Sequence, residues 1–274
     1  MGKGPSTLFS ARNLSVSFGG VKAVDDVSFD IEEGEVFSVI GPNGAGKTTL
    51  LNLISRFYDP APGGEMLFDG QDITHSPAHR IAHLGIARTF QNIELFEHET
   101  VLRNLLIGLH ARRRTSLLAE LLFAPSVVRQ ELEFRHRAEE VIDLLDLQPY
   151  REKAIAGLPY GVRKLVEVGR ALCLGPKLLL LDEPSSGLNP EETEDVAYWI
   201  EDVNEDFGAT ILMVEHDMKL VGEVSDRVMV LADGAVLAIG TAAEIRSHPE
   251  VARVYLGEEL GEEFGEEPEK EVVS

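Results

Sequence analysis

Hydrophobic and polar residues alternate near the start of the chain, and unbroken apolar runs follow. Residues 8–31 alternate around Gly19-Gly20, which predicts two antiparallel strands joined by a tight turn. Residues 36–40 and 178–181 are apolar throughout, as expected of strands in a parallel sheet that is covered on both faces. The pattern therefore predicts a strand pair followed by an α/β core.

Helical periodicity occupies most of the middle of the chain. It begins near residue 100, continues to about residue 172, and returns between the later strands. The helical stretches are residues 48–57, 131–147, 162–174, 191–205 and one that begins near residue 217. Further short strands are expected at residues 66–68, 86–90, 210–214, 228–231 and 236–239. This order predicts an α/β core that is interrupted by a helical insertion.

Length and composition are those of a soluble globular protein. The chain has 274 residues, of which 44% are hydrophobic and 26% charged, enough for one large domain or one domain with a subdomain. No run approaches the roughly 20 apolar residues that a membrane-spanning helix needs. The N-terminus lacks the apolar stretch of a secretion signal, and a single cysteine, Cys173, excludes an internal disulfide. A cytoplasmic location is therefore expected.

The charge distribution limits the partners that the chain can bind. A net charge of −22 argues against nucleic acid, because a phosphate backbone repels such a surface. The compact basic run Arg112-Arg113-Arg114 is expected to be a solvated helix end. Glutamates crowd residues 258–274, which bury little apolar surface, so we expect a disordered acidic tail there.

A glycine-rich loop joins the apolar strand at 36–40 to the helix at 48–57. Glycines let successive backbone N–H groups turn toward a polyphosphate, and the helix N-terminus adds a positive partial charge. The loop fits the pattern G-x-x-x-x-G-K-[ST] and reads Gly41-Pro42-Asn43-Gly44-Ala45-Gly46-Lys47-Thr48, followed by Thr49. Lys47 is expected to reach the β- and γ-phosphates, and the Thr48 hydroxyl to bind Mg²⁺. The loop predicts binding of ATP with Mg²⁺.

Two carboxylates follow the apolar run at 178–181. Asp182 and Glu183 lie at the carboxyl end of this predicted strand, which is the edge where open α/β sheets bind ligands. Asp182 is expected to hold Mg²⁺, generally through water. Glu183 can polarise the attacking water as a general base, a role worth roughly 10² to 10⁴ in rate. The pair predicts hydrolysis of the bound nucleotide.

Together with these motifs, several other segments resemble the ATP-binding cassette (ABC) family from about residue 8 to residue 257. Gln91 matches the glutamine of the family's Q-loop, which contacts Mg²⁺ and the water and links to the membrane subunit. His216 matches the switch histidine that contacts the γ-phosphate, and Phe18 stands where the family places a ring against adenine. The segment that resembles the D-loop is Ser185-Ser186-Gly187-Leu188-Asn189, with Asn189 in place of the commoner Asp.

The signature element departs from the family's usual Leu-Ser-Gly-Gly-Gln. It reads Leu158-Pro159-Tyr160-Gly161-Val162. Pro159 removes a hydroxyl and a backbone N–H that could contact a γ-phosphate, and Val162 removes an amide side chain. Gly161 remains at the head of the predicted helix, so backbone N–H groups there can still face an anion. The departure bears on the strength of the phosphate contact across a dimer and on the turnover rate.

This resemblance implies an architecture and a function. It implies a P-loop NTPase core with an antiparallel β subdomain, one ABC ATPase domain at 6–257, a helical subdomain inserted at about 98–174, and the tail at 258–274. The signature is similar to that of ATPases serving branched-chain amino-acid importers, and other segments resemble the larger of that system's two ATPase subunits. These include the insertion around residues 116–129. The chain is thus expected to power an importer of branched-chain or other hydrophobic amino acids.

The resemblance also implies partners. Two ATPase subunits close head to tail around two ATP molecules, so we expect a homodimer or a heterodimer with a similar subunit. Transmembrane permease subunits would dock near Gln91 and the helical insertion, which makes the chain a peripheral protein on the cytoplasmic face of the membrane. A solute-binding protein outside the membrane would take part indirectly.

Other functions stay open at the level of sequence. A urea or amide importer shares much of the pattern, and a lipid or lipopolysaccharide exporter is the nearest alternative among transporters. A soluble regulatory ABC ATPase acting on ribosomes usually carries two cassettes and a basic linker, whereas this chain has one cassette and a strongly acidic balance. A DNA-repair relative would carry long coiled coils, and no sustained heptad run is present. A small-molecule kinase would leave Gln91, Gly161 and His216 without a shared purpose.

Overall fold

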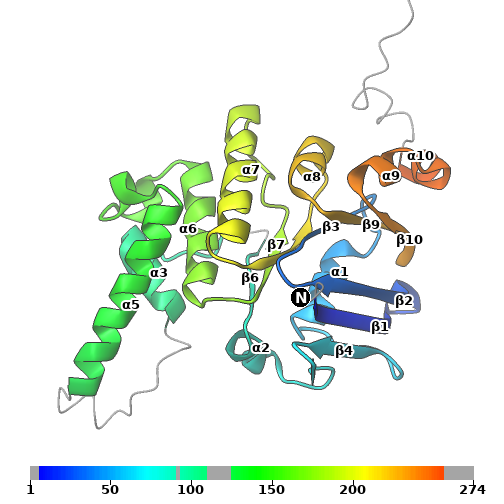
Figure 1. Ribbon diagram of the computed structural model, residues 1–274, viewed down its shortest axis with the longest axis horizontal. Helices are drawn as coiled ribbons and strands as arrows, with labels where there is room; N and C mark the ends of the chain where they lie inside the picture. Colours follow the sequence, from blue (N-terminus) through cyan, green and yellow to red (C-terminus); the bar gives the residue numbers. More distant parts are fainter. Residues whose placement is uncertain (1–5, 91–92, 110–124, 256–274) are drawn as a thin grey trace, which may run out of the picture.

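The computed structural model describes residues 6–90, 93–109 and 125–255 (Figure 1). Gln91, the basic run 112–114, most of the segment 116–129 and the acidic tail at 258–274 lie outside the described residues.

The N-terminal strands form an antiparallel sheet in the order β2-β1-β4-β5. The predicted hairpin is confirmed, because Phe18 pairs with Val21 across a turn at Gly19 and Gly20, both of which have positive φ. The strands of this sheet are β1 Thr7–Phe18, β2 Val21–Glu32, β4 Glu65–Phe68 and β5 Gln71–Asp72. This sheet places Phe18 at the end of its longest strand pair.

A second sheet has the strand order β10-β9-β3-β8-β7-β6. Its neighbouring strands are parallel except for the edge strand β10, which pairs antiparallel with β9. The strands are β3 Val36–Ile40, β6 Ile86–Arg88, β7 Leu178–Asp182, β8 Thr210–Val214, β9 Arg227–Ala232 and β10 Ala235–Gly240. The carboxyl ends of β3, β7 and β8 therefore meet at one edge of the sheet.

The apolar runs are explained by burial on both faces of this sheet. In β7, Leu178 and Leu180 belong to one hydrophobic core, whereas Leu179 and Leu181 belong to the other. All four are fully buried, and burial of each leucine side chain contributes roughly 1.5–3 kcal/mol relative to exposure. A strand with both faces covered needs no polar alternation, which confirms the predicted parallel sheet.

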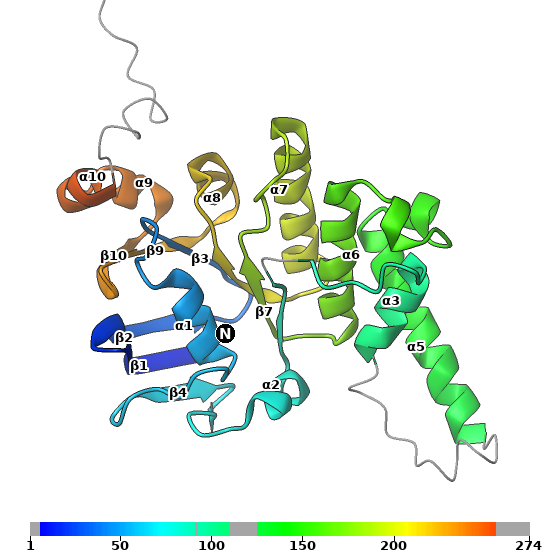
Figure 2. The ribbon, with the colours of Figure 1, turned by 180° about the vertical axis from the view of Figure 1, so that it is seen from behind.

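Helices cover both faces of the larger sheet. Helix α1 Lys47–Ile54 shares a core with the antiparallel sheet, while α7 Pro190–Glu205 and α8 Met218–Val224 contribute to the core of the other face. The helical part gathers at one end of the molecule (Figure 2). Its described elements are α3 Val101–Gly108, α5 Pro125–Leu144, α6 Tyr160–Cys173 and two short 3-10 turns, Gln148–Tyr150 and Ile155–Gly157.

Several helix boundaries differ from the pattern-based expectation. The described part of helix α5 extends from Pro125, ahead of the expected residue 131, and the helix ends at Leu144 shortly before Asp146, which has φ 52°. Helix α6 begins at Tyr160 rather than 162, directly after Pro159, whose φ of −52° and ψ of 154° place it as the N-cap. Gly161 is thus the second residue of the helix.

Three short helices were not expected from the sequence. They have five to seven residues each, too few turns for a helical period to show in the hydrophobic pattern. They are α2 Ala78–Leu84, α9 Ala242–Arg246 and α10 Pro249–Tyr255. In the part of the chain that is described, no helix is long and apolar enough to cross a membrane.

Candidate functional site

The glycine-rich loop between β3 and α1 is fixed by close backbone neighbours. A Cβ added at Gly41 would lie 2.2 Å from the carbonyl oxygen of Leu231, and one at Gly46 would lie 2.2 Å from that of Ala23. Both glycines also have positive φ, 152° and 98°. Only glycine fits at these two positions, so the backbone path of the loop is fixed by its packing against these two carbonyl groups.

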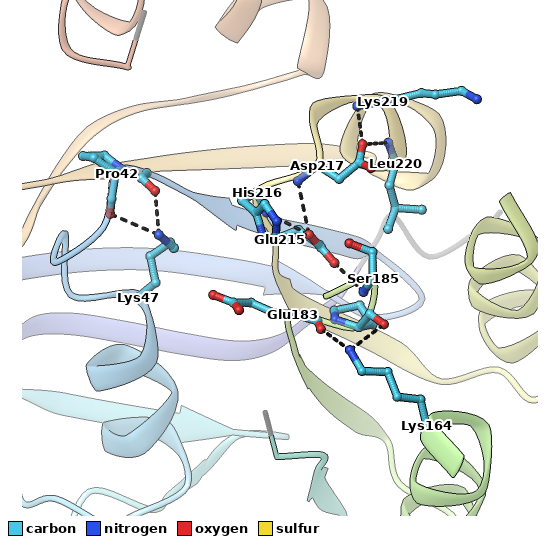
Figure 3. Close-up of polar contacts among 12 residues, drawn as sticks. Pro42, Lys47, Lys164, Glu183, Ser185, Glu215, His216, Asp217, Lys219 and Leu220 are labelled. Carbon is cyan, nitrogen blue, oxygen red and sulfur yellow. Dashed lines mark hydrogen bonds and ion pairs between the residues drawn. The ribbon is translucent and has the colours of Figure 1, made fainter. Parts of the chain in front are cut away.

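Lys47 lies inside this loop at the first position of α1. Its ammonium Nζ donates to the carbonyl oxygens of Gly41 and Pro42, at 2.5 and 3.1 Å (Figure 3). Burial lowers the pKa of Lys47, although the nearby carboxylates of Glu183 and Asp182 act in the opposite direction. The cation therefore stands within the curve of the loop, where a phosphate group would meet it. Thr48 is exposed and Thr49 partly buried.

Asp182 presents an unsatisfied oxygen at the end of β7. The residue is 4% exposed, and its Oδ2 accepts a hydrogen bond from Nη2 of Arg88 at 2.9 Å. Its Oδ1 is buried and accepts no hydrogen bond from the described residues. A buried carboxylate oxygen without a donor fits a hard cation such as Mg²⁺, which takes one or two carboxylates together with substrate phosphates. Among the residues described, no cluster of three or more acidic, His or Cys side chains could hold a metal by itself.

Glu183 follows Asp182 in a left-handed conformation, with φ 51°. This conformation is uncommon for a residue other than glycine. Its backbone N–H donates to the carbonyl of Val214 at the end of β8. Figure 3 shows the Glu183 carboxylate directed toward the side of the site where Lys47 lies. The carboxylate therefore points toward the side of the site where the phosphate loop lies.

His216 lies at the carboxyl end of β8, beside this acidic pair. Its side chain is 58% exposed, with Nδ1 3.6 Å from Oε2 of the fully buried Glu215. The next residue, Asp217, caps α8 by accepting hydrogen bonds from the backbone N–H groups of Lys219 and Leu220. The structure thus brings together Lys47, Glu183 and His216 from three separate segments (Figure 3).

The signature segment lies against the D-loop of the same chain. A Cβ added at Gly187 would meet the Tyr160 ring at 3.1 Å, and one at Gly161 would meet Glu192 at 3.0 Å and Leu188 at 3.6 Å. A pocket of about 130 Å³ is lined by Gly161, Val162, Leu188 and Asp182 among others. Leu158 is 8% exposed, and Pro159 offers no side-chain cap to α6. The signature therefore adjoins the D-loop, and α6 and α1 lie on opposite sides of β7 in both views (Figures 1 and 2).

Asn189 has a structural role that its aspartate counterpart could also fill. Its side chain accepts a hydrogen bond from the Glu192 backbone N–H, and the Glu192 side chain accepts one from the Asn189 backbone N–H, both at 3.0 Å. This reciprocal pair is a capping box at the start of α7. The D-loop residues Ser186, Gly187 and Leu188 lead directly into it. Replacing Asp by Asn therefore keeps the cap.

Phe18 presents an aromatic surface at the end of β1. Its side chain is 46% exposed, and its ring meets that of Tyr58 edge-on at a centroid distance of 5.0 Å. An exposed ring held by a second aromatic group can stack on a planar ligand. The expected place for adenine is consistent with this geometry.

Two charged residues of the site were not singled out from the sequence. Lys164 of α6 donates to the carbonyls of Glu183 and Pro184, and Glu215 accepts from the N–H groups around it. Glu215 follows an apolar strand, as Asp182 does, and that signal could have marked it. Lys164 carries no such signal, because its role depends on the packing of α6 against the end of β7.

Comparison with known families and proteins agrees with this geometry. The ABC transporter family matches residues 24–186, more than half of the chain. A second family, described as the branched-chain amino acid ATP-binding cassette transporter, matches residues 235–261. The chain is 41% identical over 251 residues to the high-affinity branched-chain amino acid transport ATP-binding proteins BraF of Pseudomonas aeruginosa and LivG of Escherichia coli strain K12. Each alignment covers 92% of this chain and 98% of the relative.

Solved structures show the same fold. The ADP conformation of MJ1267, an ATP-binding cassette of an ABC transporter, superposes with a TM-score of 0.80 at 33% identity, covering 92% of this chain and all of the other. A dimeric bacterial ABC transporter cassette, MJ0796, gives a TM-score of 0.70 at 26% identity over 85% of this chain and 98% of the other. With its phosphate loop and acidic pair at one sheet edge, the chain belongs to the ABC transporter family as one of its ATP-binding cassettes.

Proposed function

We infer that this cassette hydrolyses ATP to power an importer of branched-chain amino acids. The observation that carries the proposal is the meeting of Lys47, Glu183 and His216 at the carboxyl edge of the parallel sheet (Figure 3), where Asp182 ends β7 and its charge acts on Lys47. A cation inside a glycine loop binds phosphates, and carboxylates opposite it serve a metal and a water. The remaining steps assign these residues their roles.

Nucleotide binding rests on the loop from Gly41 to Thr48 and on Phe18. The Lys47 ammonium exchanges its loop carbonyls for phosphate oxygens, and the loop N–H groups bind the same phosphates. The exposed Phe18 ring stacks on adenine. The Thr48 hydroxyl, the free Oδ1 of Asp182 and Gln91 would hold Mg²⁺. Mg²⁺ held there would supply positive charge that neutralises the phosphates of the nucleotide.

Hydrolysis rests on Glu183 and His216. Glu183 orients the attacking water through its carboxylate and accepts its proton, and its direction toward the Lys47 side of the site supports that role. His216 donates a hydrogen bond to the γ-phosphate from its exposed ring. The proton of the water moves to the Glu183 carboxylate as the water oxygen bonds to the γ-phosphorus, and the bond from that phosphorus to the bridging oxygen breaks, with ADP as the leaving group.

A second cassette completes the site. The signature residues lie with α6, on the other side of β7 from the phosphate loop of the same chain. A signature that contacts ATP must therefore come from a partner chain, whose Gly161 counterpart would offer backbone N–H groups at the start of α6. The D-loop residues Ser186, Gly187, Leu188 and Asn189 would lie beside it at the interface. The dimeric form of the MJ0796 cassette supports this arrangement.

Transport itself belongs to other subunits. BraF and LivG, which are named as branched-chain amino acid transport proteins, match this chain along nearly their whole length. The family that matches residues 235–261 is likewise described by branched-chain amino acid transport. We therefore place the chain on the cytoplasmic face of the membrane, bound to permease subunits near Gln91, with a solute-binding protein on the far side. The single ABC domain spans residues 6–257.

The Glu183→Gln variant tests the proposal. Gln keeps the size of the side chain but cannot accept the proton of water, so phosphate release should fall by about 10²-fold or more while ATP binding stays. With Mg²⁺ and ATP, this variant should also appear as a dimer in light scattering. Hydrolysis at the rate of the parent protein would refute the role of Glu183 as the general base.

The substrate needs a separate test with the membrane partners. Subunits that copurify with the chain would be reconstituted in vesicles together with the solute-binding protein. We expect uptake of leucine or valine that requires ATP on the cassette side and is lost in the Glu183→Gln variant. Outward movement of a lipid, or uptake of urea alone, would point to a different transporter class.

A further inference from the structure

The turn after β7 must hold an unusual backbone shape to aim the Glu183 carboxylate. Glu183 has φ 51°, and residues held in such a conformation persist only where the surroundings fix them. Its N–H is bound to Val214. The other polar backbone groups of the turn, in Glu183, Pro184 and Ser185, must therefore also find fixed partners if the carboxylate is to keep one direction.

Lys164 binds the carbonyl side of this turn. Its Nζ donates to the carbonyl oxygen of Glu183 at 2.9 Å and to that of Pro184 at 3.0 Å (Figure 3). Hydrogen bonds from an ammonium group are stronger than those between neutral groups. Lys164 comes from α6, one helical turn after Gly161 in the signature. Lys164 thus links the helix of the signature to the turn of Glu183.

Glu215 binds the N–H side of the same turn. It is fully buried, and its Oε1 accepts from the Ser185 N–H at 2.7 Å. Its Oε2 accepts from the N–H groups of His216 and Asp217, at 2.8 and 3.2 Å. One carboxylate therefore joins the turn after β7 to the segment that carries His216 (Figure 3).

We propose that Lys164 and Glu215 are positioning residues that hold the turn of residues 183–185 from its two sides and so aim Glu183 at the phosphate loop. A buried carboxylate is costly unless donors satisfy it, and here three backbone N–H groups do so. On the other side of the turn, burial lowers the pKa of Lys164, while the carboxylates of Glu215, Glu167 and Glu183 act in the opposite direction and favour its charged form. The inference rests on the proposed role of Glu183 as the base.

The arrangement also connects α6 with catalysis. Because Lys164 and Gly161 belong to one rigid helix, a movement of α6 that follows signature contact would move the Lys164 ammonium relative to the turn. The direction of the Glu183 carboxylate then depends on where α6 stands. A cassette built this way hydrolyses ATP efficiently only while α6 holds the turn.

The test compares Lys164→Met and Glu215→Gln with the parent chain in steady-state ATP hydrolysis. Methionine keeps the length of the lysine without its donors, and glutamine removes one of the two acceptor oxygens of the glutamate. We expect kcat to fall about 10- to 100-fold, because small misplacements of a catalytic group cost this much. KM for MgATP should stay within about twofold, since the phosphate loop is untouched. Lys164→Arg, which keeps the donors, should recover most of kcat.

Lys219→Met is the matched control. The Lys219 ammonium pairs with the Glu194 carboxylate, and both side chains are exposed, 72% and 59%. The kcat and KM of the Lys219→Met variant should equal those of the parent chain. A Lys164→Met variant that hydrolyses ATP as fast as this control would overturn the proposal, and so would a loss confined to KM. If Lys164→Met fails to fold, Glu215→Gln decides by the same criteria.

The double variant tests whether both residues act on one turn. If they do, the combined loss of kcat should be smaller than the product of the two single losses, because the first change already frees the turn. A product of the two losses would show independent actions and overturn the shared role. Failure of the proposed function is distinguishable from failure of this inference. If the proposed function is wrong, Glu183→Gln hydrolyses ATP at the rate of the parent. If only the positioning role is wrong, Glu183→Gln still hydrolyses ATP more slowly than the parent, by about 10²-fold or more.

Discussion

Arg88 and Asp182 form a buried ion pair that joins the ends of the neighbouring parallel strands β6 and β7. Nη2 of Arg88 lies 2.9 Å from Oδ2 of Asp182, and the two side chains are 7% and 2% exposed. The guanidinium also donates to the side chains of Asn52 and Ser55 on α1 and its cap. Arg88 therefore ties one oxygen of Asp182 to the phosphate-loop helix, while the other oxygen is buried and accepts no hydrogen bond from the described residues.

Replacing Arg88 by Met should destabilise the fold. The change leaves the Asp182 carboxylate buried without its cation, and breaking a buried pair from one side costs on the order of 3 kcal/mol of unfolding free energy. Urea unfolding at neutral pH, followed by circular dichroism, measures this loss. The control is Arg103→Met, which breaks the exposed pair with Glu99 and should leave the midpoint almost unchanged. Equal shifts of the urea midpoint in the two variants would contradict the conclusion that the buried Arg88–Asp182 pair stabilises the fold.

Burial of Glu167 on α6 should make the unfolding free energy of the chain depend on pH. The residue is 4% exposed, and its Oε1 accepts from the Phe90 N–H at 3.2 Å. Burial raises the pKa of Glu167 to about 7, although that hydrogen bond and the cations of Arg170 and Lys164 lower it in part, while Glu94 adds to the rise. The folded chain therefore keeps this proton up to about pH 7, whereas the unfolded chain loses it near pH 4.5.

The sign of the effect follows from these two values. Between them the folded state binds more protons than the unfolded state, so the unfolding free energy falls as the pH rises from 4.5 to 7. Glu167→Gln removes the titration and should become more stable than the parent as the pH increases, by on the order of 1–3 kcal/mol at pH 8 relative to pH 5. Urea unfolding at intervals between pH 5 and 8 gives the difference. A difference that stays constant over this range would rule out the raised pKa.

The motifs could be predicted from sequence because they are local. The phosphate loop, the acidic pair and the strand at 178–181 each carry their signal within a few residues, and the structure places them at one sheet edge as expected. The pairing of Arg88 with Asp182 spans 94 residues, and no local pattern records such a contact. Lys164 likewise acts only because α6 packs beside the turn that follows β7.

Cys173 should be an inert thiol in the folded chain. It lies at the end of α6 and is fully buried, and burial raises its pKa to about 12. Only the thiolate reacts with an alkylating reagent, so alkylation by iodoacetamide at pH 8 should be roughly 10³-fold slower than in urea. Because the chain has one cysteine, mass spectrometry reads a single modification. Similar rates with and without urea would show that the core around α6 opens readily in the native state.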